Sequence, residues 1–216
     1  MPNIKLIYFE LPGRGETTRL LFTLGKIPFE YCRVPFDQWP SVKPTTPFGQ
    51  LPVLEVDGKQ LAQSAAIELY AAKLAGLYPD DPWQAAKVDE LVAFLGEWYT
   101  VFSSVASKDP QDRPAARKAI VESDLNPKIA KLNELLSKVG PEEFVVGPKL
   151  TYADIAVFST LSWFSCGFYE GVPKDLYKAF PAVTAFHTRI ASLPEVKGIY
   201  ESATEGCLLA FKPATA

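Results

Sequence analysis

Short apolar runs separated by turn residues dominate the first third of the chain, and a helical periodicity interrupts them twice. The apolar runs suit buried or half-buried strands, and leucines spaced three and four residues apart suit helices. Asp57-Gly58, between two of the runs, is a pair that two-residue hairpin turns prefer. A proline-rich stretch around Trp39 is predicted as a loop. The predicted strands are residues 4–9, 29–34, 53–56 and 59–62, and the predicted helices are residues 16–24 and 65–74.

Helical periodicity replaces this pattern in the rest of the chain. Apolar residues at i, i+3, i+4 and i+7 begin at Val88, and the pattern returns over residues 120–136, where Pro127 is expected to kink a helix. Thr151 and Asp154 have the spacing of a capping box and precede the charge-free residues 155–169, which predict a buried core helix. Residues 181–193 predict a further helix. We therefore expect an α/β domain over residues 1–78, a linker over 79–84 and an all-α domain over 85–216.

The composition and charge of the chain argue against several classes of partner and cellular location. The chain has 216 residues, is 48% hydrophobic and has a formal net charge of -3, with no run rich in lysine or arginine. This balance argues against nucleic acid or an anionic membrane as a partner. The charge-free run over residues 155–169 is shorter than the roughly 20 residues that span a bilayer. The first ten residues are not those of a secretory signal, and three scattered cysteines favour a reducing, cytoplasmic compartment.

The sequence lacks the residues that several kinds of catalytic or binding site need. The chain has one histidine, His187, which we interpret as a packing or helix-surface residue rather than a metal ligand or a member of a triad. No metal site is expected. The segment GRGETTR at residues 13–19 lacks the third glycine of the dinucleotide motif and the GK[ST] of the P-loop, so it is weak evidence for a nucleotide.

The predicted β-α-β-β-β-α order, with Pro52 at the start of its third strand, is the thioredoxin arrangement. A disulfide oxidoreductase of this kind would have C-x-x-C where the first strand meets the first helix, but that turn has Tyr8 and Arg14 instead. If the Leu51-Pro52 bond is cis, the N–H and C=O groups of Leu51 can face outward and pair with a bound peptide. Ser64, expected at the N-cap of the next helix, would offer a site for a carboxylate.

Four segments, spread over both domains, together resemble the cytosolic glutathione transferases. They are IKLIYFELPGRGETTRLLF, PFGQLPVLEVDG, LAQSAAIELY and LTYADIAVF. The position of Tyr8, the segment DQWP and the segment PFGQLPVLEVDG are most similar to the sigma class, which includes glutathione-dependent prostaglandin D synthases and the S-crystallins. The resemblance implies the glutathione transferase fold, a thioredoxin-like domain followed by an all-α helical bundle. It also implies a homodimer that joins glutathione to small hydrophobic electrophiles in detoxification.

The resemblance also implies roles for individual residues. Tyr8 would donate a hydrogen bond to the glutathione sulfur and favour the thiolate, and Arg14 would add positive charge beside it. The remaining glutathione contacts would come from Trp39, Lys43, Gln50, Leu51, Pro52, Gln63, Ser64 and, from the partner subunit, Glu97. The hydrophobic substrate would lie between the domains against Phe9, Leu11, Tyr99, Phe102 and Leu208.

Two departures from the sigma pattern concern the dimer. Glu97 stands where an aspartate is expected, with Gly96 in place of a second acid, and Leu69 stands where an arginine of the interface is common. Other functions stay open on the same scaffold: a glutathione-dependent prostaglandin isomerase that uses the same thiolate, or a non-catalytic structural or ligand-binding protein like the S-crystallins. A glutathione-dependent reductase would want a cysteine in place of Tyr8.

Overall fold

The computed structural model describes residues 2–213 and divides the chain into two compact units, one up to Asp81 and one from Pro82 onward. The first long helix of the second unit begins at Pro82, inside the segment 79–84 that the sequence predicts as a linker. Proline is well tolerated in the first turn of a helix, because the N–H group that it lacks would have no partner there.

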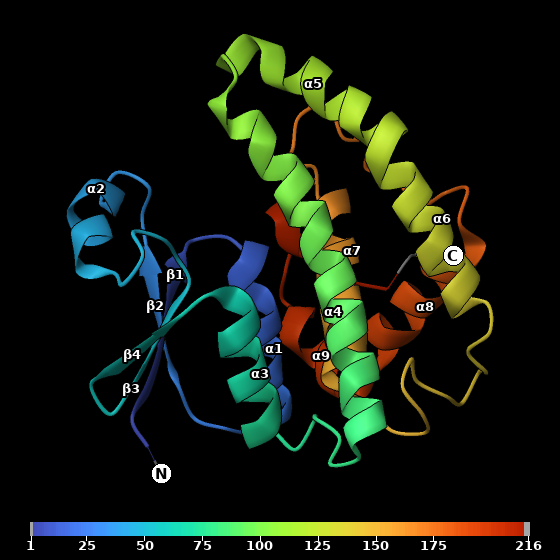
Figure 1. Cartoon of the computed structure of the whole chain (residues 1–216), viewed down its shortest axis with the longest axis horizontal. Coiled ribbons are helices and arrows are strands. Elements are labelled where there is room, and N and C mark those ends of the chain that lie inside the picture. The colour runs from blue at the N-terminus through green and yellow to red at the C-terminus, as the bar shows by residue number, and fades with distance from the viewer. Residues whose placement is uncertain (1, 214–216) are drawn as a thin grey trace. The chain divides into compact units, whose positions relative to one another are not determined.

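The first unit is a four-stranded sheet in the order β2-β1-β3-β4. The two strands of the predicted β-α-β segment, β1 and β2, pair in parallel, and the hairpin formed by β3 and β4 adds antiparallel strands beside β1. Helices α1 and α3 pack side by side against this sheet (Figure 1). The elements are β1 (Ile4–Phe9), α1 (Glu16–Leu24), β2 (Glu30–Val34), α2 (Trp39–Val42), β3 (Val53–Val56), β4 (Lys59–Ala62) and α3 (Ser64–Leu74).

Turn chemistry predicted the hairpin correctly and the loop before it incorrectly. Asp57 and Gly58 have φ values of 49° and 78°, and positive φ at both central residues is what a type I′ turn requires. The predicted loop around Trp39 instead contains α2 and a 3-10 turn over Lys43–Thr45. Pro40 and Pro44 suggested a loop, but each lies in a first turn, where a missing N–H group breaks no hydrogen bond.

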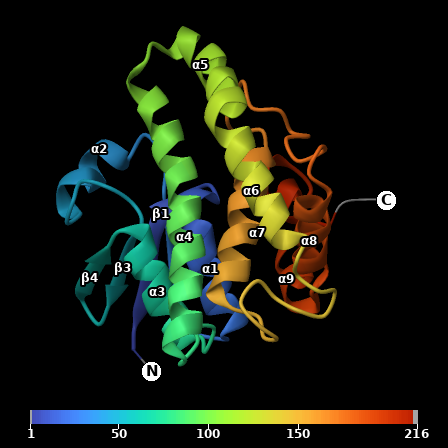
Figure 2. The same ribbon diagram turned by 45° about the vertical axis from the view of Figure 1, so that its right-hand side comes forward.

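The second unit is helical, as predicted, and is built around α7. Every residue of α7 from Tyr152 to Phe164 is buried, and α4 and α8 both pack against it (Figure 2). No helix among residues 2–213 is long and apolar enough to cross a membrane. The helices are α4 (Pro82–Ser103), α5 (Arg113–Ile120), α6 (Asn126–Leu136), α7 (Tyr152–Ser165), α8 (Pro181–Ser192) and α9 (Pro194–Tyr200), and a 3-10 segment follows over Gly206–Phe211.

The start of α7 is fixed by the predicted capping box. The backbone N–H of Thr151 donates to Asp154 at 2.8 Å and its hydroxyl donates to the same carboxylate at 2.9 Å. Asp154 also accepts from the backbone N–H of Val145, which ties the preceding loop to the helix. These three bonds offset the cost of burying a carboxyl group at 0% exposure, although burial is strong enough to raise the pKa of Asp154.

The expected disturbance at Pro127 takes a specific form. A single π-helical turn over Val121–Leu125 separates α5 from α6, and Pro127 lies in the first turn of α6. Proline cannot donate the hydrogen bond to the fourth residue before it, and its ring crowds that residue's carbonyl group. The wider turn accommodates both effects, so the pattern over residues 120–136 is one helical stretch with an irregular turn.

His187 is a packing residue. Its Nε2 atom lies 2.8 Å from the hydroxyl oxygen of Ser162, and its ring lies 5.0 Å from that of Phe158, both of which belong to α7. Burial lowers the pKa of His187 from 6.5 to about 4, so the imidazole is neutral at pH 7. Among the residues that the structure describes, no cluster of three or more histidine, cysteine, aspartate or glutamate side chains could hold a metal ion.

The buried histidine predicts a loss of stability in acid. In the unfolded chain His187 takes up a proton near pH 6.5, whereas the folded protein resists protonation until about pH 4. Its stabilising effect is therefore full above pH 6.5 and falls as the pH drops toward 4, by about 2–3 kcal/mol. Denaturant unfolding of wild type and His187→Gln at pH 7, 5.5 and 4.5 measures this, and equal pH slopes in the two proteins would contradict it.

Candidate active site

The first strand ends in a tyrosine whose hydroxyl is held by the following turn. Tyr8 is 6% exposed, and its phenol oxygen accepts a hydrogen bond of 2.9 Å from the backbone N–H of Arg14. A phenol can accept at its oxygen and still donate its own proton. An N–H dipole aimed at the oxygen also makes the hydroxyl a better donor, because bonds in such a chain strengthen one another.

Two glycines make room for this side chain. A Cβ atom added at Gly13 would lie 2.5 Å from the Tyr8 hydroxyl oxygen, and one at Gly15 would lie 2.6 Å from a carbon of the ring. Gly13 also has a φ of 42°, which disfavours other residues. The sequence places Tyr8 and Arg14 at this turn but does not predict that the two glycines accommodate the tyrosine ring. The spacing G-R-G directly after a strand that ends in tyrosine was the available signal.

Leu51 and Pro52 lie just ahead of the ladder that β3 forms. The Leu51-Pro52 peptide bond is cis, and the pairing of β3 begins at Val53, opposite Ile7 and Ala62. Leu51 is thus outside the register of the sheet, at the end of β3 that adjoins the carboxyl end of β1. Extended main chain that continues beyond a ladder is what a bound peptide can pair with.

The start of α3 differs from the expectation in one respect. Ser64 is the first residue of the helix, and Gln63 precedes it as the N-cap with φ 72° and ψ 116°. Ser64 was therefore placed wrongly at the N-cap: the chain turns into the helix one residue earlier. The N–H groups of the first turn still lack helical partners and favour an anion. Positive φ at a residue other than glycine is uncommon and gathers at ligand sites.

Side chains from separate loops meet around this end of the sheet. The amide of Gln63 donates to that of Gln50 at 3.4 Å, which joins the start of α3 to the loop before β3. Phe9 makes an edge contact with Trp39 of α2 at 5.4 Å between ring centroids. Lys43 passes close to Gly49, because a Cβ atom there would lie 3.4 Å from its Cε. These contacts link several of the expected glutathione residues of the first unit, and Glu97 lies on α4 of the second unit.

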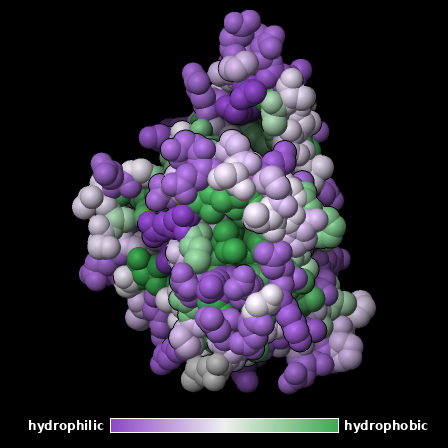
Figure 3. Space-filling model, turned by 90° about the vertical axis from the view of Figure 1, so that its left-hand side faces the viewer, coloured by the Kyte–Doolittle hydropathy of each residue, from purple (hydrophilic) through white to green (hydrophobic). Residues whose placement is uncertain are grey.

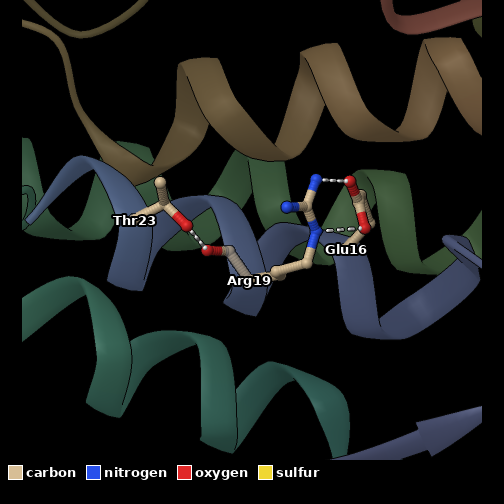
Figure 4. Close-up of polar contacts among 3 residues, drawn as sticks. All are labelled: Glu16, Arg19 and Thr23. Atoms are coloured by element: carbon tan, nitrogen blue, oxygen red, sulfur yellow. Dashed lines mark hydrogen bonds and ion pairs between the residues drawn. The ribbon is translucent and has the colours of Figure 1, made fainter. Parts of the chain in front are cut away.

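A buried ion pair lies in the first turns of α1, directly after the turn that holds Tyr8. Glu16, only 2% exposed, accepts two hydrogen bonds from the Arg19 guanidinium, and the Thr23 hydroxyl donates to the Arg19 carbonyl at 2.8 Å (Figure 4). A carboxylate in the first turn of a helix also interacts favourably with the helix dipole. Arg19 therefore stabilises the segment that follows Gly15, a structural role.

The other expected substrate residues divide between the two units. Leu11 lies beside the Tyr8 hydroxyl, since a Cβ at Gly13 would also meet its Cδ1 atom at 2.8 Å. In the second unit, Tyr99 and Phe102 both pack on the ring of Phe164, and Phe102 is 4% exposed, so most of its surface is core. Leu208 is 37% exposed, in the 3-10 segment near the C-terminus.

Glu97 lies on α4, in the second unit, and already has a partner. Its carboxylate forms an ion pair with Lys128 of α6. The glutamate side chain is 57% exposed, and pairs this exposed contribute little stability, so Glu97 can exchange one cation for another at small cost. A contact between Glu97 and a partner subunit's glutathione stays a prediction.

Comparison with known proteins agrees with the architecture over nearly the whole chain. Residues 4–73 match the family model of the glutathione S-transferase N-terminal domain, and residues 97–203 match that of the C-terminal domain. Glutathione S-transferase 1 of Ascaris suum is 34% identical over 202 residues, which cover 91% of this chain and 95% of the relative. Hematopoietic prostaglandin D synthase of Gallus gallus is 32% identical over 197 residues, which cover 91% and 94%.

Solved structures of similar proteins have the same fold. Prostaglandin synthase D of Nilaparvata lugens superposes with a TM-score of 0.83 at 28% identity, covering 94% of this chain and all of that one. The sigma-class glutathione transferase of Fasciola hepatica gives 0.79 at 25% identity, covering 95% and 99%. An α/β glutathione-binding domain followed by a helical domain is thus the class of protein that fold and relatives define. The chain belongs to the glutathione S-transferase family.

Proposed function

We propose that this chain conjugates the sulfur of glutathione to small hydrophobic electrophiles and that Tyr8 activates the thiol. The observation that carries the proposal is the fixed Tyr8 hydroxyl, which accepts from the Arg14 N–H at 2.9 Å between two glycines that fit its ring. A phenol held in this way is preorganised to donate a hydrogen bond to a sulfur anion. Preorganised donors stabilise charge more effectively than water does, because they need not reorient.

Glutathione is a tripeptide with a carboxylate at each end, and the first unit offers groups for each part. We assign the main chain of Leu51 to the cysteinyl residue, and the first turn of α3 at Ser64 to the γ-glutamyl carboxylate. Gln63 and Gln50, which bond to each other, would add neutral hydrogen bonds nearby. The glycyl end would lie against Trp39 and Lys43, and Pro52, in the cis bond after Leu51, would keep the Leu51 main chain turned outward.

The chemistry follows from the state of the sulfur. A thiol with a pKa near 8.5 is mostly protonated at pH 7, and the thiolate is the nucleophile. A hydrogen bond from Tyr8 and the positive charge of Arg14 both favour the thiolate and lower the thiol pKa. The thiolate attacks an electrophilic carbon, forms the C–S bond and expels a leaving group such as chloride. Holding both reactants together adds the advantage of proximity.

The acceptor residues are proposed from both units. Phe9 and Leu11 adjoin Tyr8 in the first unit, and in the second unit Tyr99 is half-buried and Leu208 is 37% exposed. Phe102 would contribute less to binding the hydrophobic substrate, because its side chain is largely buried.

Wild-type protein tests the proposal directly. We expect it to be retained on immobilised glutathione, to be eluted by free glutathione, and to release chloride from a chlorodinitrobenzene-type acceptor in a glutathione-dependent reaction. Retention without turnover would favour a structural or ligand-binding protein on the same scaffold. Absence of retention would overturn the glutathione site as a whole.

A prostaglandin isomerase is the second candidate function. Two observations favour it: the TM-score of 0.83 with a prostaglandin synthase D and the identity of 32% with a relative named for prostaglandin D synthesis. Both reactions would use the same thiolate. Formation of a prostaglandin D product that requires glutathione would support the isomerase, and conjugation alone would favour the transferase.

We also propose a cytoplasmic sigma-class homodimer with a detoxifying role. Phe48, in the loop before β3, is 67% exposed, and Phe36 is 60% exposed. Hydrophobic side chains are also visible among hydrophilic ones on the face drawn in Figure 3. Large exposed apolar side chains mark interaction surfaces when they gather. Sedimentation of wild type and Phe48→Ser measures whether Phe48 contributes to a dimer.

A further inference from the structure

Two cysteines far apart in the sequence meet in the second unit. Cys166 directly follows the last residue of α7, and Cys207 lies in the 3-10 segment over Gly206–Phe211, 41 positions further on. The Cys166 thiol donates to the Cys207 sulfur across 2.8 Å. A disulfide bond is about 2.05 Å long, so the two sulfurs are within about 1 Å of bonding distance.

The surroundings of Cys166 and Cys207 favour thiol–disulfide exchange at these two side chains. Both side chains are partly exposed, so a small reagent can reach them. Burial, followed by the contact with Cys207, raises the pKa of the Cys166 thiol to about 12, which keeps its proton in place as the donor in the pair. Cys207 accepts that bond, so the two sulfur atoms face each other directly. Gly167 follows with φ 85°, so the chain turns away directly after Cys166.

We propose that Cys166 and Cys207 form a reversible disulfide, oxidised by a small disulfide such as glutathione disulfide and reduced by glutathione. In the first step the Cys207 thiolate attacks glutathione disulfide, forms a mixed disulfide and releases one glutathione thiolate. In the second step the Cys166 sulfur attacks Cys207, loses its proton and releases the second glutathione. The two cysteines are oxidised and one glutathione disulfide is reduced to two thiols.

The bond would anchor the C-terminal segment. It would join the 3-10 segment to the end of α7 and close a loop that contains α8 and α9. Closing a loop of this length restricts the unfolded chain, and the expected rise in Tm is about 5–10 °C. Leu208 directly follows Cys207, so its main chain would be held as well. The proposal does not depend on conjugation by Tyr8, because it concerns two residues outside that site.

The test is incubation of the full chain with glutathione disulfide, followed by intact mass and peptide mapping without reductant. We expect the loss of two hydrogen atoms, a linked pair of peptides that contain Cys166 and Cys207, and the higher Tm, all reversed by glutathione. Cys32→Ser is the matched control and should behave as wild type, since Cys32 lies on β2 and bonds to Glu30. Cys166→Ser should stop at the mixed disulfide with Cys207.

Other results would overturn the proposal. One is wild-type protein that keeps both thiols after oxidation, and another is wild-type protein that accumulates only glutathione adducts. A disulfide that involves Cys32 instead would do the same. Conjugating activity is measured separately, so an inactive protein that forms the bond would refute the proposed function and leave this inference standing.

Discussion

Replacing Tyr8 with phenylalanine is expected to lower kcat for conjugation by about 10- to 100-fold and to leave glutathione binding nearly unchanged. The substitution removes one oxygen atom and keeps the ring that fits between Gly13 and Gly15. A hydrogen bond to a charged group contributes about 1.5–3 kcal/mol, and each 1.36 kcal/mol is a factor of ten in rate. The decrease in kcat is expected from the loss of the proposed hydrogen bond between the Tyr8 hydroxyl and the glutathione thiolate.

The proposed role of Tyr8 also predicts the direction in which the pH–rate profile of the variant shifts. If Tyr8 stabilises the thiolate as proposed, its hydroxyl lowers the pKa of the bound thiol, and its removal raises that pKa. The pH–rate profile of Tyr8→Phe should therefore shift to higher pH, with part of the lost activity regained in alkali. A loss of activity that is equal at every pH would argue that the variant is damaged in another way.

The measurement compares kcat and KM of both proteins with a chlorodinitrobenzene-type acceptor between pH 6 and 9. Tyr70→Phe is the matched control: Tyr70 lies on α3, outside the candidate site, and should keep full activity. Retention of Tyr8→Phe on immobilised glutathione checks that the site is folded. Equal kcat in wild type and Tyr8→Phe would refute the proposed role of the hydroxyl.

The sequence was most informative where local chemistry and burial agree. The alternation of apolar runs and turn residues located β1, β2 and the hairpin, because Asp57-Gly58 can adopt the positive φ values of its turn. The capping box predicted the start of α7, and the absence of charge predicted its burial. In each case one short segment contains both the signal and the structure that it specifies.

Other features depend on segments that are distant in the sequence. The prolines around Trp39 fit a loop and a first helical turn equally well, so α2 was missed. The positive φ of Gln63 has no local signature. In the second unit, aromatic residues at helical spacing fit a core and a ligand wall alike, and Phe102 belongs mainly to the core. The pair of Cys166 and Cys207 arises only when the chain folds back.

Replacing Gly15 with alanine is expected to crowd the ring of Tyr8. The backbone of Gly15 has φ −87° and ψ −19°, which any residue can adopt, so Gly15→Ala introduces no backbone strain. Only the added methyl group matters, and it would lie 2.6 Å and 2.7 Å from two ring carbons of Tyr8. Because Tyr8 is buried, the ring has little space to move, and overpacking of this kind costs about 1–3 kcal/mol.

Displacing the ring also displaces the hydroxyl. We expect Gly15→Ala to lower kcat/KM by about 10- to 100-fold, as much as removing the hydroxyl itself, since misplacement by 1 Å can cost that much. Gly198→Ala is the matched control: an added Cβ there meets nothing within 4 Å in the described chain, and alanine within α9 should add about 0.5–1 kcal/mol of stability. Its activity should equal that of wild type.

A double-mutant cycle separates the loss of the hydroxyl from general damage. If Gly15→Ala acts by moving the Tyr8 oxygen, it should lower kcat strongly in wild type and only slightly in Tyr8→Phe, where no oxygen remains to be moved. Losses that multiply in the double variant would instead mean that Gly15 affects catalysis by a route other than Tyr8. The absence of any effect would mean that the ring shifts without cost, and the hydroxyl would then need no fixed position to activate the thiol.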